Sequence, residues 1–423
     1  MAKADGQTKV IQNARVIDGT GAKPLEKATV VIQKDAISAV GPASQVQAPP
    51  RAEVIDAKGM TLMPGLIDAH LHFFGIRRYE FLLWAMEHVA LHAIRSVYEV
   101  RRILEAGFTT VRDCGSDNAL FIKQAIEEGS IAGPRLRAVG RFMCQTGGIP
   151  DLPFLPLSVM EGRDGRGFCR LTDGVDECLK AAREQLRGGA TELKIGTTGG
   201  IDPSFIVAES AFTVEEIRAM ASVAHNVGKK ITAHNNVLMG EPCTGIRKAI
   251  VGGVDAIDHG YWIDDPTLEL MAEKGVVWIA TIGYLQRAVE HGKDLNLSPI
   301  YVDKCKRAVE SIADTTPRAK KMGVKRASGS DFLGTPADPH GEEAFELEMQ
   351  VRCGLSEMEA LVTATRRNAE LFNLDARLGT VEKGKLADLI LVDGDPLKNI
   401  KVLQDASRIK MVMLEGQVRV RRD

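Results

Sequence analysis

The sequence is poor in aromatic residues, carries almost no net charge and contains no long hydrophobic run. Aromatic residues make up 5% of the 423 positions, and the formal net charge is -2. A nearly neutral chain gives no electrostatic reason to bind nucleic acid or an anionic membrane surface. No apolar run approaches the roughly 20 residues that cross a bilayer, and residues 1–7 lack the apolar core of a secretion signal. We therefore expect neither nucleic acid nor a membrane as a partner.

Paired cysteine motifs are also missing. The cysteines are odd in number and contain no Cys-x-x-Cys pair; they stand at positions 114, 144, 169, 178, 243, 305 and 353. This pattern favours reduced, buried thiols in a cytoplasmic protein over a disulfide framework.

The two ends of the chain share a sequence pattern that the middle lacks. Residues 8–60 and 386–423 contain short apolar strands broken by turns. Strand-rich ends around a different middle predict one small β-sandwich domain built from both termini, residues 1–60 and 386–423. The chain is also longer than a usual single domain, so we expect residues 61–385 to form a second, larger domain.

The middle of the chain alternates short apolar strands with amphipathic helices, which is typical of parallel βα units in an α/β protein. Eight such units close a (β/α)8 TIM-type barrel, whose catalytic groups project from the carboxyl ends of the strands. The candidate strands are Thr61–His72, Phe108–Cys114, Leu136–Phe142, Glu192–Gly196, Lys230–His234, Val254–His259, Val276–Ile282 and Val324–Asp331. The Gly- and Pro-rich stretch Met143–Arg170 has little periodicity, and we expect a substrate-facing lid there rather than a disordered insert.

Side chains with metal-ligand chemistry stand at the ends of five of these strands. Each is a weak signal alone, because a strand-end histidine more often packs in the core and an Asp after Ser-Gly-Ser more often forms a turn. Together they occupy the positions that one metal pocket requires. The group comprises His70, His72, Lys194, His234, His259 and Asp331.

The remaining histidines do not share this placement. Four of them lie in helix-like stretches, where ordinary packing or exposure is expected: His88, His92, His225 and His291. His340 follows Asp331 by nine residues and is a candidate to line the site.

Lys194 is an unexpected member of a metal pocket, because an ammonium group repels bound cations. Addition of carbon dioxide to its amine gives a carbamate, which is an anionic oxygen ligand able to bridge two divalent ions. The alternative is a core lysine paired with Asp or Glu. The residues alone leave both possibilities open.

The chain resembles the metal-dependent amidohydrolase superfamily over nearly its whole length. The similarity is to the imidazolonepropionase-like cluster, which includes prolidase-type carboxypeptidases, ochratoxin-type amidases and phenylurea hydrolases. The residues that carry it are Pro64–His72, Gly107–Asp113, Leu193–Ile195, Ala233–His234, Asp258–Gly260, Gly329–Asp331 and Gly379–Leu389.

The resemblance implies a binuclear metal site. His70, His72 and Asp331 would hold a buried ion, and His234 and His259 a more exposed one. Carboxylated Lys194 (N6-carboxylysine) and a hydroxide would bridge the ions, and Asp331 would move the proton during hydroxide attack. Zinc is the default metal for such nitrogen and oxygen ligands. The resemblance also implies a homo-oligomer.

Two segments depart from the pattern of peptide-cleaving relatives, which we associate with holding a free carboxylate. Gly-Gly-His-Gly-Asp is replaced by Gly147-Gly148-Ile149-Pro150-Asp151, and His-Ala-Tyr by His234-Asn235-Asn236. A buried carboxylate without partners is costly, so we expect an uncharged, partly aromatic amide, carbamate or urea as substrate. Candidate pocket residues are Phe73, Phe74, Met143, Ile149, Asn235, Tyr261, Tyr284 and His340, with Phe142, Phe154, Leu155 and Trp262 as further apolar candidates.

Three alternatives remain at this stage. A dipeptidase or ochratoxin-type carboxypeptidase could hold the carboxylate through Arg77, Arg78 or Arg141. A deaminase or cyclic amidase is disfavoured by Lys194, because the deaminases of the superfamily typically use one metal and lack the modified lysine. A non-catalytic relative is disfavoured because all six ligand positions are filled.

Overall fold

The computed structural model describes residues 8–78, 84, 86–116, 118–160, 162, 169–201, 211–236 and 242–423. The strands are β1 Lys9–Val16, β2 Leu25–Gln33, β3 Ala36–Pro42, β4 Glu53–Asp56, β5 Thr61–Pro64, β6 Leu66–Leu71, β7 Phe108–Asp113, β8 Arg135–Ala138, β9 Phe142–Cys144, β10 Cys169–Leu171, β11 Leu193–Gly196, β12 Ile231–Asn235, β13 Ala256–His259, β14 Val277–Ile279, β15 Arg326–Ala327, β16 Leu389–Val392, β17 Ile409–Leu414 and β18 Gln417–Arg421.

The α-helices are α2 Val89–Glu105, α3 Ala119–Glu127, α4 Leu157–Met160, α5 Val175–Arg187, α6 Val214–His225, α7 Thr244–Gly252, α8 Asp265–Lys274, α9 Ile282–His291, α10 Pro299–Lys321, α11 Phe345–Arg352, α12 Glu357–Val362 and α13 Asn368–Leu371. A π-helical turn, Thr363–Arg367, joins α12 to α13. No helix in the described part of the chain is both long and apolar enough to cross a bilayer.

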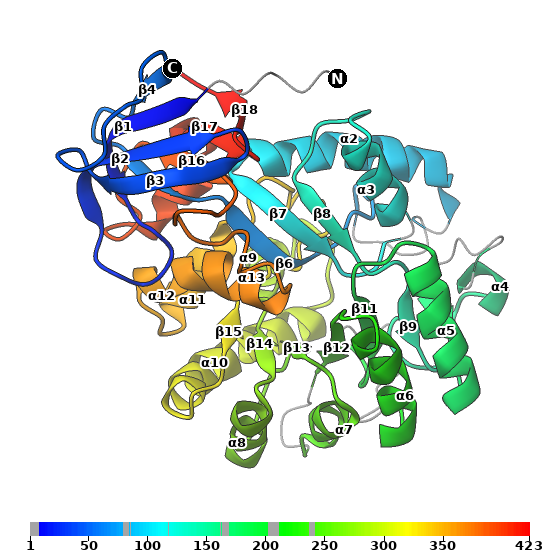
Figure 1. Cartoon of the computed structure of the whole chain (residues 1–423). Helices are drawn as coiled ribbons and strands as arrows, with labels where there is room; N and C mark the ends of the chain where they lie inside the picture. The colour runs from blue at the N-terminus through cyan, green and yellow to red at the C-terminus, as the bar shows by residue number, and fades with distance from the viewer. Residues whose placement is uncertain are drawn as a thin grey trace.

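Both termini contribute to one sheet at one end of the molecule (Figure 1). It has eight strands in the order β18-β17-β16-β5-β1-β2-β3, with β4 paired to β1. Side chains alternate across β16: Leu389 and Leu391 join the apolar cluster of the sheet itself, whereas Ile390 and Val392 pack with residues of α2 and β7. The predicted sheet built from both termini is confirmed, and β16 is buried on both faces.

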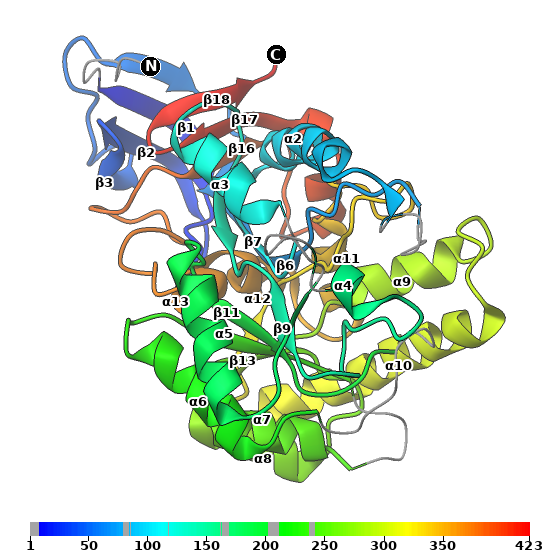
Figure 2. The same cartoon turned by 90° about the vertical axis from the view of Figure 1, so that its right-hand side faces the viewer.

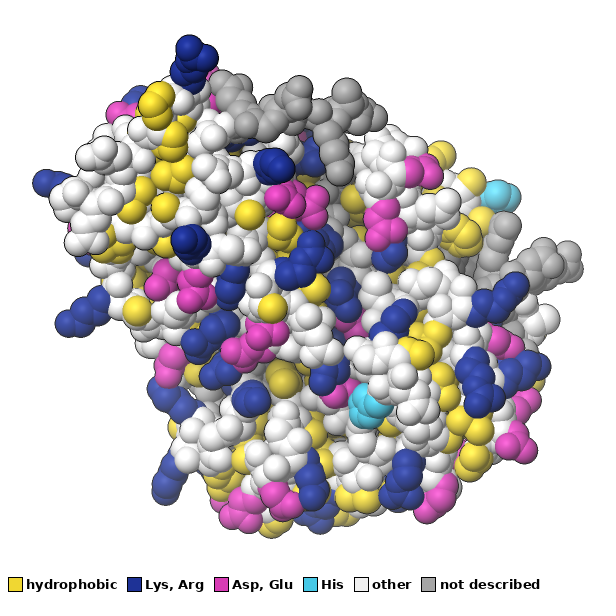
Figure 3. Space-filling model, viewed as in Figure 1, with side chains coloured by type: hydrophobic (Ala, Val, Ile, Leu, Met, Phe, Trp, Pro, Cys, Tyr) yellow, Lys and Arg dark blue, Asp and Glu magenta, His cyan; other side chains and the backbone are white. Residues whose placement is uncertain are grey.

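The rest of the molecule surrounds a parallel barrel. Figure 2 shows α2 and α3 beside the terminal sheet, with α6, α7 and α8 on the side of the molecule away from that sheet. On the face drawn in Figure 3, basic and acidic side chains are interspersed, as expected for a chain of net charge -2.

Backbone hydrogen bonds close eight parallel strands into a ring. Ladder pairing connects β6, β7 and β8, and separately β11, β12, β13, β14 and β15. Thr191 N donates to Ala138 O at 2.8 Å and bridges β8 to β11, while Ala69 N donates to Ser328 O at 2.9 Å and bridges β15 to β6. The predicted (β/α)8 barrel is confirmed.

The first predicted barrel strand, Thr61–His72, is divided in two at Gly65. β5 pairs with β1 and β16 in the terminal sheet, and β6 pairs with β7 in the barrel. Any larger side chain at Gly65 would clash, because a Cβ there would lie 2.2 Å from Thr109 Oγ1. The predicted domain boundary between residues 60 and 61 stays a prediction. β5 begins just after that boundary, although it pairs with strands of the terminal sheet.

The third predicted strand, Leu136–Phe142, is also divided. β8 lies in the barrel wall, and β9 pairs with β10 and β11 above it. The predicted lid Met143–Arg170 therefore contains the end of β9, the short helix α4 and the start of β10, although residues 161 and 163–168 lie outside the described residues.

Asn368 fastens the seam between the first and last barrel strands. Its side chain is fully buried, and its Nδ2 donates to Ile67 O at 2.6 Å and to Ser328 O at 2.9 Å. Its Oδ1 accepts from Ser328 N at 3.3 Å. One amide thus satisfies backbone groups on both sides of the joint.

We predict that Asn368→Ala destabilises the protein by about 2–4 kcal/mol, because it leaves buried backbone groups at the seam without partners. Chemical denaturation followed by circular dichroism measures this change. Gln47→Ala, at an exposed position, is the control and should stay within about 0.5 kcal/mol of wild type. Equal stability of both variants would contradict the role of Asn368.

Candidate metal centre

The six predicted ligand side chains meet at one mouth of the barrel. They belong to β6 and the residue after it, to β11, β12 and β13, and to the segment after β15. Parallel strands bring their carboxyl ends to the same edge, so residues far apart in sequence converge there. All six line a single pocket: His70, His72, Lys194, His234, His259 and Asp331.

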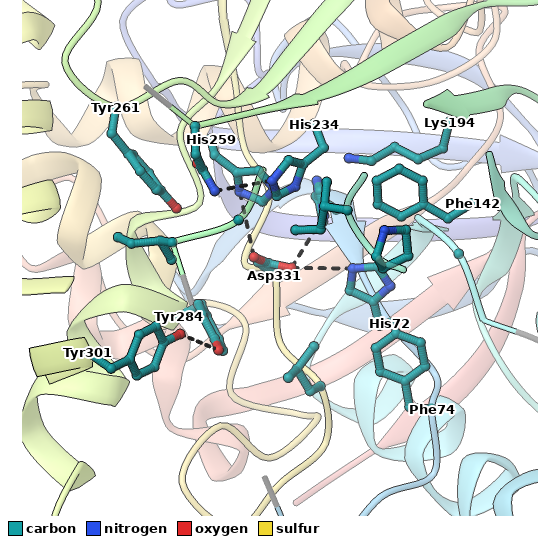
Figure 4. Close-up of a pocket in the computed structure, with 18 residues that line it drawn as sticks. His72, Phe74, Phe142, Lys194, His234, His259, Tyr261, Tyr284, Tyr301 and Asp331 are labelled. Carbon is teal, nitrogen blue, oxygen red and sulfur yellow. Dashed lines mark hydrogen bonds and ion pairs between the residues drawn. The ribbon is translucent and has the colours of Figure 1, made fainter. Parts of the chain in front are cut away.

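The carboxylate of Asp331 lies among the imidazoles (Figure 4). Its Oδ1 is 3.3 Å from His70 Nε2 and 3.4 Å from His72 Nε2, and its Oδ2 is 3.6 Å from His259 Nδ1. The ring of His234 lies 4.4 Å from that of His259, centroid to centroid. The structure thus gathers four imidazoles around one carboxylate.

Burial and charge fix the protonation of these groups. Burial lowers the pKa of His234 well below its ordinary value and the pKa of His259 to about 3, so both imidazoles are neutral. Burial opposes ionisation of Asp331, but His70 and His72 hold the pKa of that carboxyl well below its usual range. His234 and His259 therefore present neutral nitrogens and Asp331 an anionic oxygen, which are the forms that bind metals. Burial opposes protonation of His70, but nearby negative charges, including those of Asp258 and Asp331, raise the pKa of His70 well above its ordinary value, so this imidazole would release a proton on binding an ion.

The spacing of these atoms fits a metal ion. His70, His72 and Asp331 each offer a ligand atom, and these atoms lie within 4.8 Å of one another. Ligands about 2.1 Å from a tetrahedral ion are about 3.4 Å apart, which is close to the His–Asp separations of 3.3 and 3.4 Å. Nδ1 of His72 is buried and has no hydrogen-bond partner among the described residues.

Asp258 is the buried counter-ion beneath this cluster. It lies against the amine of Lys194, and it accepts a hydrogen bond from Thr232 Oγ1 at 2.9 Å. Its Oδ1 is 3.3 Å from His70 Nδ1 and 3.4 Å from Arg112 Nη2. Burial opposes its ionisation, but Lys194 and His70 lower the pKa of Asp258 well below the usual range. The amine of Lys194 thus lies in a buried ion pair with Asp258.

Sequence reasoning gave Asp258 no role, because strand alternation would turn it away from the side that His259 faces. His259 has a φ of 68°, so the alternation breaks at the end of β13 and both side chains reach the barrel interior. Thr281 and Asp331, at the ends of neighbouring strands, also have positive φ values of 50° and 62°. Such non-glycine conformations cost about 1–3 kcal/mol each and gather at functional sites.

Hydrogen bonds hold this strained rim in place. Trp278 Nε1 donates to His259 O at 2.7 Å, and His259 Nδ1 lies 2.7 Å from Thr281 Oγ1. Asp331 N donates to His70 O at 2.7 Å, which ties the last ligand to the first strand.

The pocket encloses about 110 Å³ above the ligand cluster. One wall is apolar and the other carries phenol groups, as Figure 4 shows for Phe74 and Phe142 opposite Tyr284 and Tyr301. Of the predicted substrate residues, four line it: Phe74, Ile149, Tyr261 and Tyr284.

The other four predicted substrate residues do not line the pocket. Phe73 points away from its neighbour His72 and packs in an apolar cluster, and Met143 is buried in the main core. Asn235 is fully buried on the opposite side of β12 from His234, and both polar atoms of its side chain lack a partner among the described residues. His340 is buried behind His72, where Glu343 and Glu99 outweigh burial and raise its pKa to about 9.

Several pocket residues were not predicted, including Tyr301, Ile201 and Leu333. Tyr301 comes from α10 and lies 2.8 Å from Tyr284, hydroxyl to hydroxyl. No sequence signal marks it, because a helix packing over the barrel mouth brings it there rather than a strand end. Asn236, which sequence analysis treated as a departure from relatives, lines the pocket and lies 3.1 Å from His234 Nε2.

Comparison with known proteins identifies the family. The amidohydrolase family profile matches residues 61–419. Ochratoxinase from Aspergillus niger is 29% identical, over 98% of this chain and 87% of its own length. A crystal structure of an amidohydrolase is 32% identical with a TM-score of 0.89, and covers 98% of this chain and 100% of its own. A prolidase complexed with N-methylphosphonate-L-proline is 31% identical with a TM-score of 0.87, at the same coverages.

This chain belongs to the amidohydrolase family and is a hydrolase. The resemblance inferred from the strand-end motifs is confirmed.

We predict that Asp258→Asn lowers the unfolding free energy of the chelator-treated protein by about 3–5 kcal/mol, because Lys194 and Arg112 lose their buried counter-charge. Urea denaturation measures this difference. Thr232→Val removes one hydrogen bond to the same carboxylate without removing its charge, and should cost about 1 kcal/mol. A smaller loss in Asp258→Asn than in Thr232→Val would show that Asp258 is not the counter-ion.

Proposed function

We propose that this chain is a binuclear metal-dependent amidohydrolase that cleaves a C–N bond of a small, uncharged and partly aromatic amide, carbamate or urea. The observation that supports it is the composition of the pocket. Its floor is built from metal-ligand side chains, and Lys194 is the single Lys or Arg among the described residues that line it. Because these lining residues offer a carboxylate no cationic side chain other than Lys194, the pocket suits an uncharged substrate.

Two groups of side chains would hold the ions, which we expect to be zinc. His70, His72 and Asp331 would hold one ion, His234 and His259 would hold the other, and Lys194 would bridge them as a carbamate. When bound, two divalent ions lower the pKa of a shared water and polarise the scissile carbonyl. Carbamate formation also removes the positive charge of Lys194 from the floor of the site.

Asp331 would move the proton in this reaction. Its carboxylate is ionised and faces the space between the imidazoles. It would accept a proton from the attacking water and deliver it to the departing nitrogen. Asp331 is therefore both a ligand and the proposed catalytic base.

The preference for an uncharged substrate rests on the residues that could hold a carboxylate. Ile149 lines the pocket where peptide-cleaving relatives are expected to carry a histidine. Arg77, one of the alternative carboxylate binders, is paired with Glu99 and bonded to Ile76 O at 2.9 Å. Arg77, Arg78 and Arg141 are absent from the described lining of the pocket.

A second candidate function is a dipeptidase or an ochratoxin-type carboxypeptidase. It is favoured by the similar prolidase, solved with a proline derivative, and by the similarity to ochratoxinase. In that case the carboxylate of the substrate would be held by hydroxyl and amide groups, such as those of Tyr284 and Asn236, rather than by a cation.

We predict that the chelator-treated protein takes up two equivalents of Zn²⁺ per chain with bicarbonate present and at most one without it, because the bridge needs carbon dioxide. Elemental analysis gives the metal content, and carbon-13 NMR after loading with labelled bicarbonate detects the carbamate. Lys194→Ala should bind at most one ion under either condition. Two ions in Lys194→Ala would remove the bridging role of Lys194.

We predict that wild type hydrolyses anilides and phenylureas faster than dipeptides, and that Ile149→His raises kcat/KM for a dipeptide. One added donor to a charged group is worth about 1.5–3 kcal/mol, or roughly 10–100-fold. Ile149→Leu keeps the wall apolar and is the matched control. Dipeptide turnover by wild type that equals or exceeds anilide turnover would support the second candidate instead.

A further inference from the structure

Both peptide groups that flank His72 are bonded to the segment that follows Asp331. His72 N donates to Phe332 O at 3.0 Å, and His340 Nε2 lies 3.0 Å from His72 O. Phe332 is the residue directly after Asp331. The segment 332–340, which we call the positioning loop, therefore begins at one ligand and fixes the backbone of another.

Internal bonds hold the positioning loop in one shape. The buried carboxylate of Asp338 accepts from Leu333 N and Thr335 N, each at 3.1 Å, and from the hydroxyl of Thr335. Gly334 has a φ of +80°, and a Cβ there would lie 2.9 Å from His340 Cδ2. The loop can bring His340 close to its own backbone because Gly334 has no side chain.

His340 is anchored on its other side by Glu343. His340 Nδ1 lies 2.9 Å from Glu343 Oε1, and Glu343 Oε2 accepts from Gly341 N at 2.9 Å. The exposed fractions of His340 and Glu343 are 2% and 1%. Because the carboxylate and His72 O can only accept, both ring nitrogens of His340 act as donors.

A separate contact secures the next peptide group. Phe73 N donates to Asp113 Oδ2 at 2.7 Å, and Asp113 in turn accepts from Ser116 Oγ at 2.6 Å. The peptide unit between His72 and Phe73 is therefore held at its oxygen by His340 and at its nitrogen by Asp113. The backbone of His72, from which its side chain projects, is therefore fixed on both sides.

We propose that the positioning loop aligns His72 with Asp331, and that His340 is a positioning residue of the metal centre rather than a substrate contact. The inference rests on the proposed metal function. His340 would hold the backbone of the ligand His72, where a shift of about 0.5 Å would disrupt the coordination geometry. Loss of such supporting bonds typically weakens metal binding about 10–100-fold.

Two double variants separate the hydrogen bond from the buried charges. His340→Gln with Glu343→Gln removes both charges but keeps an N–H donor able to reach His72 O. His340→Leu with Glu343→Leu removes the charges and the donor while filling the space. Titration of the chelator-treated proteins with cobalt(II) chloride gives affinity, and the visible spectrum of bound cobalt reports ligand geometry.

We expect the Leu pair to bind cobalt about 10–100-fold more weakly than wild type, with an altered visible spectrum. The Gln pair should stay within about threefold of wild type and keep its spectrum, because the bond to His72 O is retained. Wild-type affinity in the Leu pair, or an equal loss in both folded pairs, would overturn the proposal.

Asp338→Ala provides a test that leaves His340 and Glu343 unchanged and applies even if the Leu pair does not fold. It removes the bonds inside the positioning loop and should also weaken cobalt binding. Unchanged affinity in Asp338→Ala would overturn the proposal. Failure of wild type to bind cobalt at all would instead contradict the proposed metal function.

Discussion

The negative charge of Asp258 supports the interior of the barrel, because cationic groups from three other strands converge on it. Lys194, Arg112 and His70 approach this one carboxylate from β11, β7 and β6, in a region without solvent. At low dielectric an uncompensated charge is very costly, so the fold tolerates these cations only while Asp258 is ionised. Because Asp258 serves as counter-ion in this lower layer, Asp331 remains available to the imidazoles above it.

The site therefore has two layers, with Asp258 and its cations below and Asp331 and the imidazoles above. This arrangement explains why the mouth of the barrel can be both apolar and reactive. The polar groups of the floor are satisfied by one another or face the expected ions, so the walls need not supply counter-charges. Ile149, Phe74 and Phe142 can then line the space directly beside the ligands. Relatives with similar folds include a prolidase and an ochratoxinase. Of the positions expected to differ from peptide-cleaving relatives, Ile149 and Asn236 line the pocket, whereas Asn235 is buried behind β12.

Strand-end positions were predictable from sequence because alternation and parallel topology leave few places for polar residues in a barrel strand. His70, His72, Lys194, His234, His259 and Asp331 were found in this way. The same rule failed where the backbone leaves regular geometry. Asp258 was missed because His259 adopts a positive φ, and the division at Gly65 was missed because the apolar pattern runs through it without a break.

Residues supplied by helices and loops were the least predictable part of the site. Tyr301 reaches the pocket from α10, and His340 approaches His72 from behind, and both depend on packing between segments far apart in sequence. The sequence pattern placed His340 near Asp331. It did not indicate whether His340 would line the pocket or contact the backbone of His72 from behind. That distinction requires the path of the positioning loop.

The seam at Asn368 also bears on how the chain acquires its structure. Asn368 bonds to Ile67, which lies 301 positions earlier in the chain, and backbone bonds at Ala69 and His70 close the same joint between β6 and the segment after β15. Contacts of such high sequence separation form late, because the entropy of closing a long loop must be overcome first. During synthesis, the half of the site on β6 emerges long before its partner Asp331. The ligand cluster is therefore a property of the completed barrel, and a nascent chain that ends before Asp331 holds its histidines without the carboxylate that organises them.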